Sequence, residues 1–82
     1  MNYQIEFKPR ALKDLEILPV AESHRIVAKT EAMQNGLVGD VKRLTNFTPE
    51  YRLRIGDYRI LFEVEGPKMV IYRVLHRKDA YK

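Results

Sequence analysis

The chain contains no cysteine, and this absence excludes several classes of protein at once. Without thiols there is no disulfide scaffold, no thiolate nucleophile and no zinc-finger site. No apolar run approaches the roughly 20 residues that a membrane-spanning helix needs, and no glycine-rich motif could cradle a phosphate. We therefore expect one small domain over residues 1–82, located in the cytoplasm.

The residues that most nucleases use for catalysis are equally scarce. There are only 2 histidines, and one of them, His24, falls on a predicted helix far from the strands in sequence. No His, Cys and Asp residues have the spacing of metal ligands, and metal-dependent phosphodiester cleavage needs a cluster of carboxylates. We expect neither a metal nor another cofactor.

The positive charge lies in the C-terminal half of the chain. Residues 1–40 carry five Lys or Arg against six Asp or Glu, whereas residues 41–82 carry ten against five. The formal net charge of +4 is therefore a property of the second half. A basic surface on a small domain indicates nucleic acid as the first candidate partner and an acidic protein as the second.

The spacing of apolar residues predicts an α+β fold. A short strand is expected at residues 2–7, and two helices are expected at 9–18 and from about 20 to 35. Residues 37–50 read mostly as loop, with a short strand-like piece around 41–44. Three strands follow within residues 51–81. The prediction is thus an N-terminal strand, a helical hairpin and a mostly antiparallel sheet of three further strands, with the helices on one face.

Two turns determine which side chains share a face of this sheet. A two-residue turn at 56–57 pairs Ile55 with Tyr58 and sets Arg54 opposite Arg59. The second turn, at 66–67, is less determined by its residues. We expect an odd-length loop there, because an even-length one would bring arginines onto the apolar face.

The odd-length loop predicts specific pairs and a strongly basic open face. It pairs Val64 with Val70, Phe62 with Tyr72 and Ile60 with Val74, so that Leu53, Ile60, Phe62, Tyr72 and Val74 pack under the helices. The opposite face then carries five arginines with three apolar residues between them, namely Arg52, Arg54, Arg59, Arg73, Arg77, Leu61, Ile71 and Leu75.

This open face has two readings. One or two arginines on a sheet face are usually solvated, with their stems covering apolar surface. Five on one face, interleaved with apolar residues, favour a surface that binds a polyanion or an acidic partner. The residues expected to bind RNA are Lys42, Arg43, Arg73 and Lys78, and those expected to bind a protein partner are Leu61, Ile71 and Leu75.

Arginines could supply the charge stabilisation that RNA cleavage without a metal needs. The ribose 2′-OH can attack the adjacent phosphate, and guanidinium groups stabilise the negative charge of the transition state. Arginine cannot act as a base because its pKa is too high. The proton transfers would then fall to His76 or Tyr81, although alternation along the strand directs His76 to the other face.

Two motifs carry a family resemblance. YRLRIGDYRILF, followed by VIYRVLHRKDAY, resembles the signature of the RelE/ParE superfamily of bacterial and archaeal toxins, over essentially the whole chain. Its RelE-like branch implies metal-free cleavage of mRNA in the ribosomal A site and an antitoxin that blocks the toxin. The resemblance implies catalytic roles for the basic pair Arg52 and Arg54, for Arg59 and Arg77, and for Tyr81, with His76 as a weaker candidate.

Two departures and one alternative accompany this resemblance. Some members have lysines where this chain has Arg52 and Arg54. Because arginine does not act as a base, this replacement argues against proton transfer through the pair but leaves its stabilisation of negative charge intact. The spacing from Arg77 to Tyr81 is shorter than in some members. The ParE-like branch shares the fold and implies a toxin that binds DNA gyrase without nuclease activity, and a plain RNA- or protein-binding module is a third reading.

Overall fold

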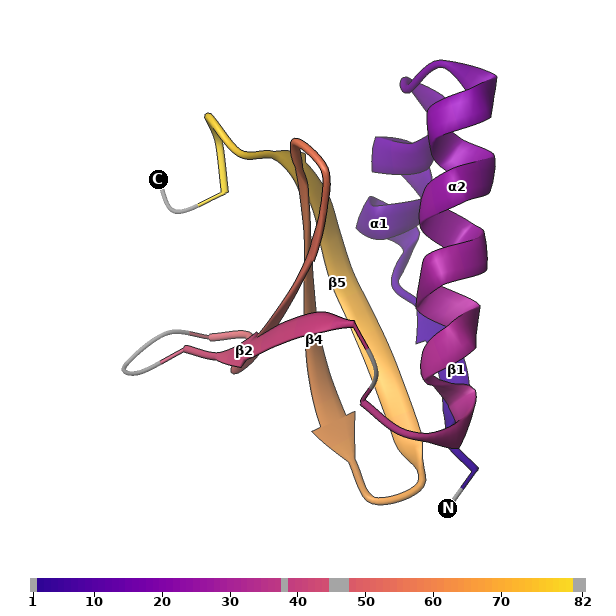
Figure 1. Cartoon of the computed structure of the whole chain (residues 1–82), viewed down its shortest axis with the longest axis vertical. Helices are drawn as coiled ribbons and strands as arrows, with labels where there is room; N and C mark the ends of the chain where they lie inside the picture. Colours follow the sequence, from indigo (N-terminus) through magenta and orange to yellow (C-terminus); the bar gives the residue numbers. More distant parts are fainter. Residues whose placement is uncertain (1, 38, 45–47, 81–82) are drawn as a thin grey trace.

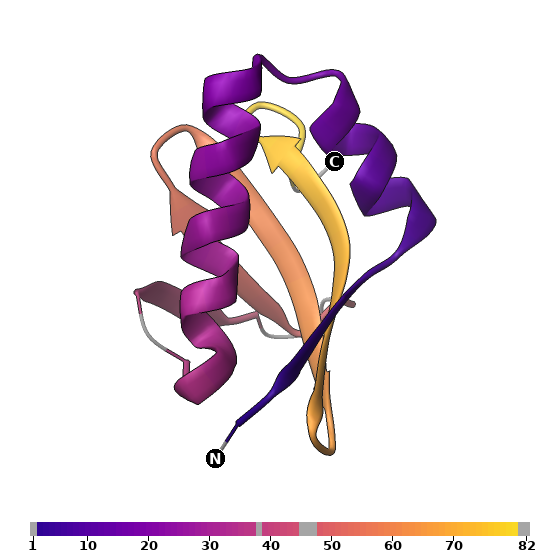
Figure 2. The same ribbon diagram turned by 90° about the vertical axis from the view of Figure 1, so that its right-hand side faces the viewer.

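The computed structural model describes residues 2–37, 39–44 and 48–80. It shows a twisted sheet with two helices packed on one of its faces, while the other face is left open by the helices (Figure 1). Seen from the helix side, α2 and α1 lie in front of the sheet, and β5 is visible between them (Figure 2). The predicted α+β class and the placement of the helices on one face are confirmed.

The elements follow the order that the apolar spacing predicts, with one strand more. The short strand-like piece expected near residues 41–44 forms a regular strand, and the second helix ends in a short 3-10 turn. The elements are β1 (Gln4–Phe7), α1 (Pro9–Glu16), α2 (Val20–Glu31), η1 (Ala32–Asn35), β2 (Asp40–Arg43), β3 (Tyr51–Ile55), β4 (Tyr58–Glu65) and β5 (Lys68–His76).

The strand order explains why the helices share one face. The sheet runs β1-β5-β4-β3-β2, so the first and last strands of the chain are neighbours. They pair in parallel, whereas all the other pairs are antiparallel. From β2 onward each strand lies beside the next one in the chain. In the sequence, the helical hairpin comes between β1 and β2. In the fold, it covers the apolar face of β3, β4 and β5.

The helices contribute few but fully buried side chains to the core. Pro9 opens α1 at a position where its missing N–H costs no hydrogen bond. Ile26 and Met33 are fully buried against the sheet. Thr30 is also buried, and its hydroxyl donates to the Ile26 carbonyl at 2.7 Å, so no polar atom is left unsatisfied there.

The β4–β5 hairpin differs from the predicted odd-length loop. A two-residue turn pairs Val64 with Met69 and Phe62 with Ile71. An irregularity between Leu61 and Phe62 then adds one extra residue on β5, after which Ile60 pairs with Val74 as predicted. The expected pairs of Phe62 with Tyr72 and of Val64 with Val70 are therefore wrong. The physical reason is a β-bulge, which lets two segments of β5 of opposite parity both direct apolar residues inward.

This bulge reverses two predicted orientations. Ile71, expected on the open face, is fully buried in the helix-side core. Tyr72, expected under the helices, instead places its hydroxyl 3.4 Å from Glu63 Oε2 and its ring 5.2 Å from Lys8 Nζ. Burial, and secondarily the charges of Glu63 and Glu65, raise the pKa of the Tyr72 hydroxyl above its ordinary value.

Leu61 is the third residue whose expected environment changes. It lies opposite Arg52 and Arg73, on the face predicted for it. Its exposed fraction is only 3%, however, and it does not belong to the helix-side core. Side chains on the open face therefore already cover Leu61, and little of it is left for a partner.

Ile71→Ala tests the placement of Ile71 in the core. We expect the free energy of unfolding to fall by about 2–5 kcal/mol, because the truncation leaves a cavity between the helices and the sheet. Denaturant unfolding measures this loss. The matched control is Ile17→Ala, which removes the same atoms from a side chain that is 83% exposed and should cost less than about 0.5 kcal/mol. Equal losses in the two variants would contradict the bulged register.

Candidate functional site

Two cross-strand rows of side chains form the face that the helices leave open. Residues opposite one another in neighbouring strands lie about 5 Å apart, so each row is a continuous strip across the sheet. We call the two strips together the basic face. One strip consists of Lys42, Arg52, Leu61 and Arg73, and the other consists of Asp40, Arg54, Arg59 and Leu75.

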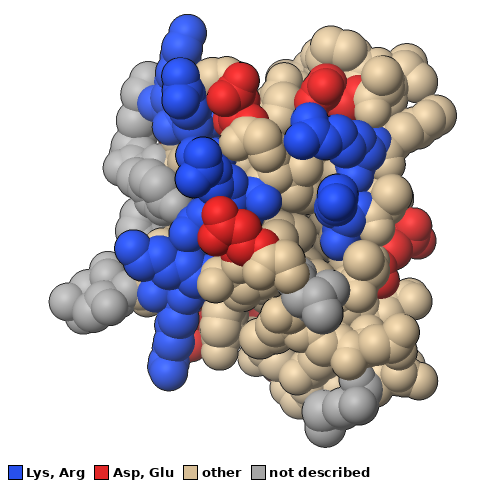
Figure 3. Space-filling model, in the orientation of Figure 1, with Lys and Arg blue, Asp and Glu red and all other residues tan. Residues whose placement is uncertain are grey.

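Space-filling representation shows how the charges are distributed. On the side of the molecule away from the helices, Lys and Arg side chains follow one another in a column, and carboxylates interrupt this column (Figure 3). The basic face is therefore a mixed surface with an excess of positive charge, which agrees with the ten Lys and Arg against five Asp and Glu of residues 41–82.

Arg54 and Arg59 lie directly opposite each other on β3 and β4, as the two-residue turn predicts. Arg59 Nη1 donates to the carbonyls of Gly56 at 3.0 Å and of Tyr58 at 3.1 Å, so its guanidinium is held at the turn. Arg54 is exposed and makes no side-chain hydrogen bond or ion pair with any residue that the structure describes. Like charges in this position repel, and an anion between them would relieve that repulsion.

Two aspartates lie beside arginines that were predicted for this face, and sequence reasoning missed both contacts. Asp40 belongs to the second strip, and Asp57 lies in the β3–β4 turn. Arg52, whose side chain is only 12% exposed, lies 3.8 Å from Asp40. Arg77 Nε lies 3.9 Å from Asp57 in a largely exposed pair. These distances are long for ion pairs, and exposed pairs stabilise a fold by at most about 1 kcal/mol. Arg77 can therefore exchange its carboxylate for a phosphate at low cost, whereas the side chain of Arg52 is mostly covered.

Arg73 stands at the β5 end of one strip, but its guanidinium is directed to α1 and not outward as its predicted role in RNA binding requires. Its Nε donates to Asp14 Oδ2 at 2.8 Å and its Nη2 donates to Oδ1 at 3.1 Å. The backbone N–H of Val74 donates to the same Asp14 Oδ2 at 2.9 Å. The hydrogen bonds to Asp14 raise the pKa of Arg73 further. Bidentate pairing of this kind is strong, so Arg73 is a structural residue that joins β5 to α1.

The remaining predicted RNA-binding residues divide between the two faces. Lys42 lies opposite Arg52 on the basic face and is exposed. Arg43 lies opposite Tyr51, on the other face, and forms an ion pair with Glu50 at 3.4 Å. Its predicted place in the basic surface is wrong, because neighbouring residues of a strand alternate between faces. Lys78 is exposed in the turns that follow β5.

His76 lies away from the basic face, as strand alternation predicts. It is opposite Tyr58, and the two rings meet edge to face with centroids 5.6 Å apart. Its Nδ1 accepts a hydrogen bond from the backbone N–H of Lys78 at 3.3 Å. Tyr81 falls outside the described residues, so its predicted role stays a prediction. Leu75 is on the basic face opposite Arg59, where partner binding was expected of it.

Two further properties limit what the site contains. Within residues 2–37, 39–44 and 48–80, no three His, Asp or Glu side chains are grouped so that they could hold a metal ion. No helix in the described part of the chain is long and apolar enough to cross a membrane.

Comparison with known proteins identifies the family. Residues 5–81 match the family model described as the ParE toxin of type II toxin–antitoxin system, parDE, and the chain belongs to this family. It is 36% identical to Toxin RelE3 from Methanocaldococcus jannaschii, over 95% of this chain and 94% of that relative. The chain is therefore a RelE-like toxin of a type II toxin–antitoxin system, as the two motifs indicated.

Solved structures agree with this assignment. The RelB-RelE antitoxin-toxin complex from Methanococcus jannaschii contains a chain of 36% identity, with a TM-score of 0.77 over 93% of this chain and 94% of that chain. The archaeal RelE-RelB complex from Pyrococcus horikoshii OT3 gives 26% identity and a TM-score of 0.80 over 98% and 100%.

Asp14→Ala tests the attachment of β5 to α1. The substitution leaves the Arg73 guanidinium and the Val74 N–H without their acceptor, and we expect it to lower the free energy of unfolding by about 2–4 kcal/mol. Denaturant unfolding is the measurement. Glu16→Ala, which removes an exposed carboxylate from the same helix, is the control and should change stability by less than about 0.5 kcal/mol. The attachment would be refuted by equal stabilities of the two variants.

Proposed function

We propose that this toxin is an endoribonuclease that cleaves mRNA on the ribosome, in the cytoplasm, without a metal ion. One observation carries the proposal. Arg54 is exposed and has no side-chain partner in the described part of the chain, and it lies opposite Arg59, which the turn holds in place. Together with Arg52 and Arg77 these groups offer a set of guanidiniums to one phosphate or to two neighbouring ones.

The chemistry follows from what arginine can and cannot do. The 2′-oxygen attacks the adjacent phosphorus, the bond from phosphorus to the 5′-oxygen breaks, and the products are a 2′,3′-cyclic phosphate and a 5′-hydroxyl. The 2′-hydroxyl loses a proton and the leaving 5′-oxygen gains one. Guanidiniums stabilise the charge that accumulates on the phosphoryl oxygens in between. This positive charge makes a metal unnecessary for the step.

The two proton transfers need groups other than arginine. His76 contacts Tyr58 on the opposite side of β5 from Arg59 and Leu75, which weakens its candidacy. Tyr81, which lies outside the described residues, is the stronger candidate from the resemblance. Lys42 and Lys78 are proposed to bind flanking phosphates, which sets affinity and not rate.

We further propose an antitoxin as the protein partner of this chain. The solved relatives with a TM-score of 0.77 or more are named as complexes of RelE with RelB. The basic face and the net charge of +4 favour an acidic partner. Such a partner would block the toxin by covering the guanidiniums that the RNA needs.

Gyrase binding without catalysis is the second candidate. The matching family model is described as a ParE toxin, and the ParE-like branch implies that target. The long contacts of Arg52 and Arg77 with aspartates would serve a protein surface equally well. Cleavage of mRNA on translating ribosomes, compared with a gyrase supercoiling assay on the same protein, separates the two candidates.

Arg59→Ala and Arg77→Ala test transition-state stabilisation. We expect each to lower the single-turnover rate of mRNA cleavage on the ribosome by roughly 100-fold or more with little change in affinity. Lys42→Ala should weaken binding and flatten its salt dependence while the single-turnover rate is retained.

The control for these variants is Lys13→Ala, which removes an exposed cation from α1 on the other side of the molecule. It should leave both rate and affinity unchanged. Arginine variants that only weaken binding would assign the basic face to RNA binding instead of catalysis. Inhibition of gyrase with no mRNA cleavage by the wild-type protein would support the second candidate.

A further inference from the structure

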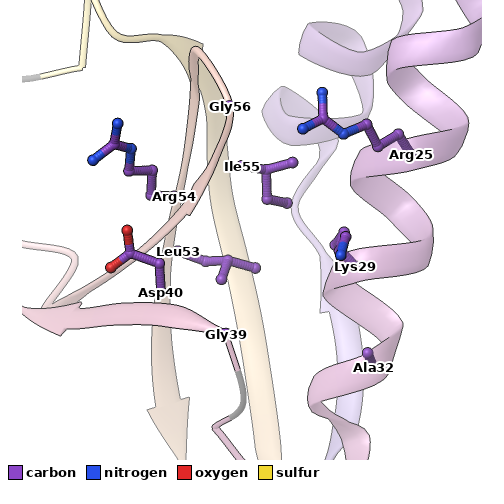
Figure 4. A pocket seen from close by; sticks show the side chains of 9 residues that line it. All are labelled: Arg25, Lys29, Ala32, Gly39, Asp40, Leu53, Arg54, Ile55 and Gly56. Atoms are coloured by element: carbon purple, nitrogen blue, oxygen red, sulfur yellow. The ribbon is translucent and has the colours of Figure 1, made fainter.

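A cleft of about 350 Å³ lies between α2 and β3, on the opposite side of β3 from the basic face. Leu53 and Ile55 point from β3 toward the helix and form its floor, while Arg25 and Lys29 extend from α2 over it (Figure 4). Ala32 completes the helical wall. The cleft thus combines an apolar floor with two cations on one side.

Two glycines keep the cleft open. Gly56 and Gly39 have positive φ angles of 57° and 102°, which residues other than glycine rarely adopt. A Cβ on Gly56 would lie 3.2 Å from Arg25 Nη2, and one on Gly39 would lie 3.2 Å from Leu53 Cδ1. A larger residue at position 56 or 39 would therefore crowd the guanidinium of Arg25 or the Leu53 side chain in the floor of the cleft.

The two cations are available for a ligand. Arg25 has one ion pair, with Glu22 at 3.7 Å, between side chains that are 50% and 36% exposed, and such a pair is weak. Lys29 makes no ion pair with a residue in the described ranges. Nothing in the packing of the helices requires two positive charges above Leu53 and Ile55.

We propose that this cleft binds an acidic, partly apolar peptide segment of the partner protein. This proposal rests on the proposed function, in which that partner is an antitoxin. A carboxylate of the segment would pair with Arg25 or Lys29. An apolar side chain would pack on the exposed Ala32 and on the stems of the two cations, above a floor that is itself nearly buried. RNA fits less well. The residues that line the cleft include no aromatic side chain on which bases could stack.

Arg54 connects the cleft to the basic face. It lines the rim of the cleft, while its side chain is directed away from α2, to the side of β3 where Asp40 also points (Figure 4). Pairing of β2 with β3 ends at Arg54, so Ile55 and Gly56 form an open edge there. A segment in the cleft can therefore pass around this edge and cover Arg54, which gives the partner a physical means of blocking the proposed site.

The test uses the product of the reading frame adjacent to this gene as the probe. The double variant Arg25→Glu/Lys29→Glu reverses two exposed charges, and glutamate has similar helix propensity, so the fold is retained. We expect the dissociation constant for the probe to rise at least roughly 10-fold, mainly through faster dissociation. The matched control, Arg10→Glu/Lys13→Glu, makes the same change of charge on α1 and should leave affinity within about 3-fold.

Carbodiimide coupling gives a second readout that does not depend on the mutants. The reagent joins a lysine amine to a carboxylate in contact with it, and mass spectrometry locates the amide. We expect Lys29 to be joined to an Asp or Glu of the probe, and Lys13 not to be. Loss of this product and unchanged affinity of the Arg25/Lys29 double variant would overturn the proposal.

Other outcomes distinguish this proposal from the proposed function. If the double variant instead loses affinity for a 20-nucleotide single-stranded RNA and binds the probe normally, the cleft is an RNA site and the peptide proposal is wrong. A wild-type protein that does not bind the probe at all removes the proposed antitoxin and the cleft proposal together. Binding through the cleft by a protein that cleaves no mRNA would support the cleft proposal and contradict the nuclease.

Discussion

The Asp14 carboxylate is the contact on which the arrangement of the sheet depends. β1 pairs with β5 only as far as Ile71, so the second half of β5 has no strand on that side. Asp14, which is 7% exposed, accepts the Val74 N–H at this unpaired edge and binds Arg73 with both oxygens. A buried carboxylate without such partners would be strongly unfavourable. The clamp thus fixes α1 against β5 and withdraws one arginine from the basic face.

Local sequence signals predicted the β3–β4 hairpin correctly, whereas contacts between distant parts of the chain could not be predicted from the sequence. A two-residue turn and strict alternation determine that Arg54 faces Arg59, because both constraints act within ten residues. The bulge at Tyr72 was missed because one uniform register was assumed along β5. A two-residue turn alone would bring arginines onto the apolar face, and the extra residue on β5 avoids this. The pairing of Arg73 with Asp14 joins residues 59 apart in sequence, which alternation cannot indicate.

The predicted partner surface shows the same limit. Leu61 and Ile71 carry the apolar character expected of a docking surface, but their exposed fractions are 3% and 0%. Sequence periodicity gives the face of a residue and not what covers it. The cleft under Arg25 and Lys29 instead presents two exposed cations and the exposed Ala32 around a floor that is nearly buried. Its helical wall and its strand floor lie in separate parts of the sequence, which is why alternation within β3 gave no sign of it.

The central claim is that guanidinium groups of the basic face promote attack by the ribose 2′-oxygen. The most direct test is cleavage of a ribosome-bound mRNA that carries one 2′-deoxynucleotide on the 5′ side of the cleaved bond. The account predicts that this single change abolishes cleavage there, whereas the unmodified mRNA yields a 2′,3′-cyclic phosphate end. Cleavage of the deoxy-substituted mRNA at the same bond, or products that carry a 5′-phosphate, would contradict it.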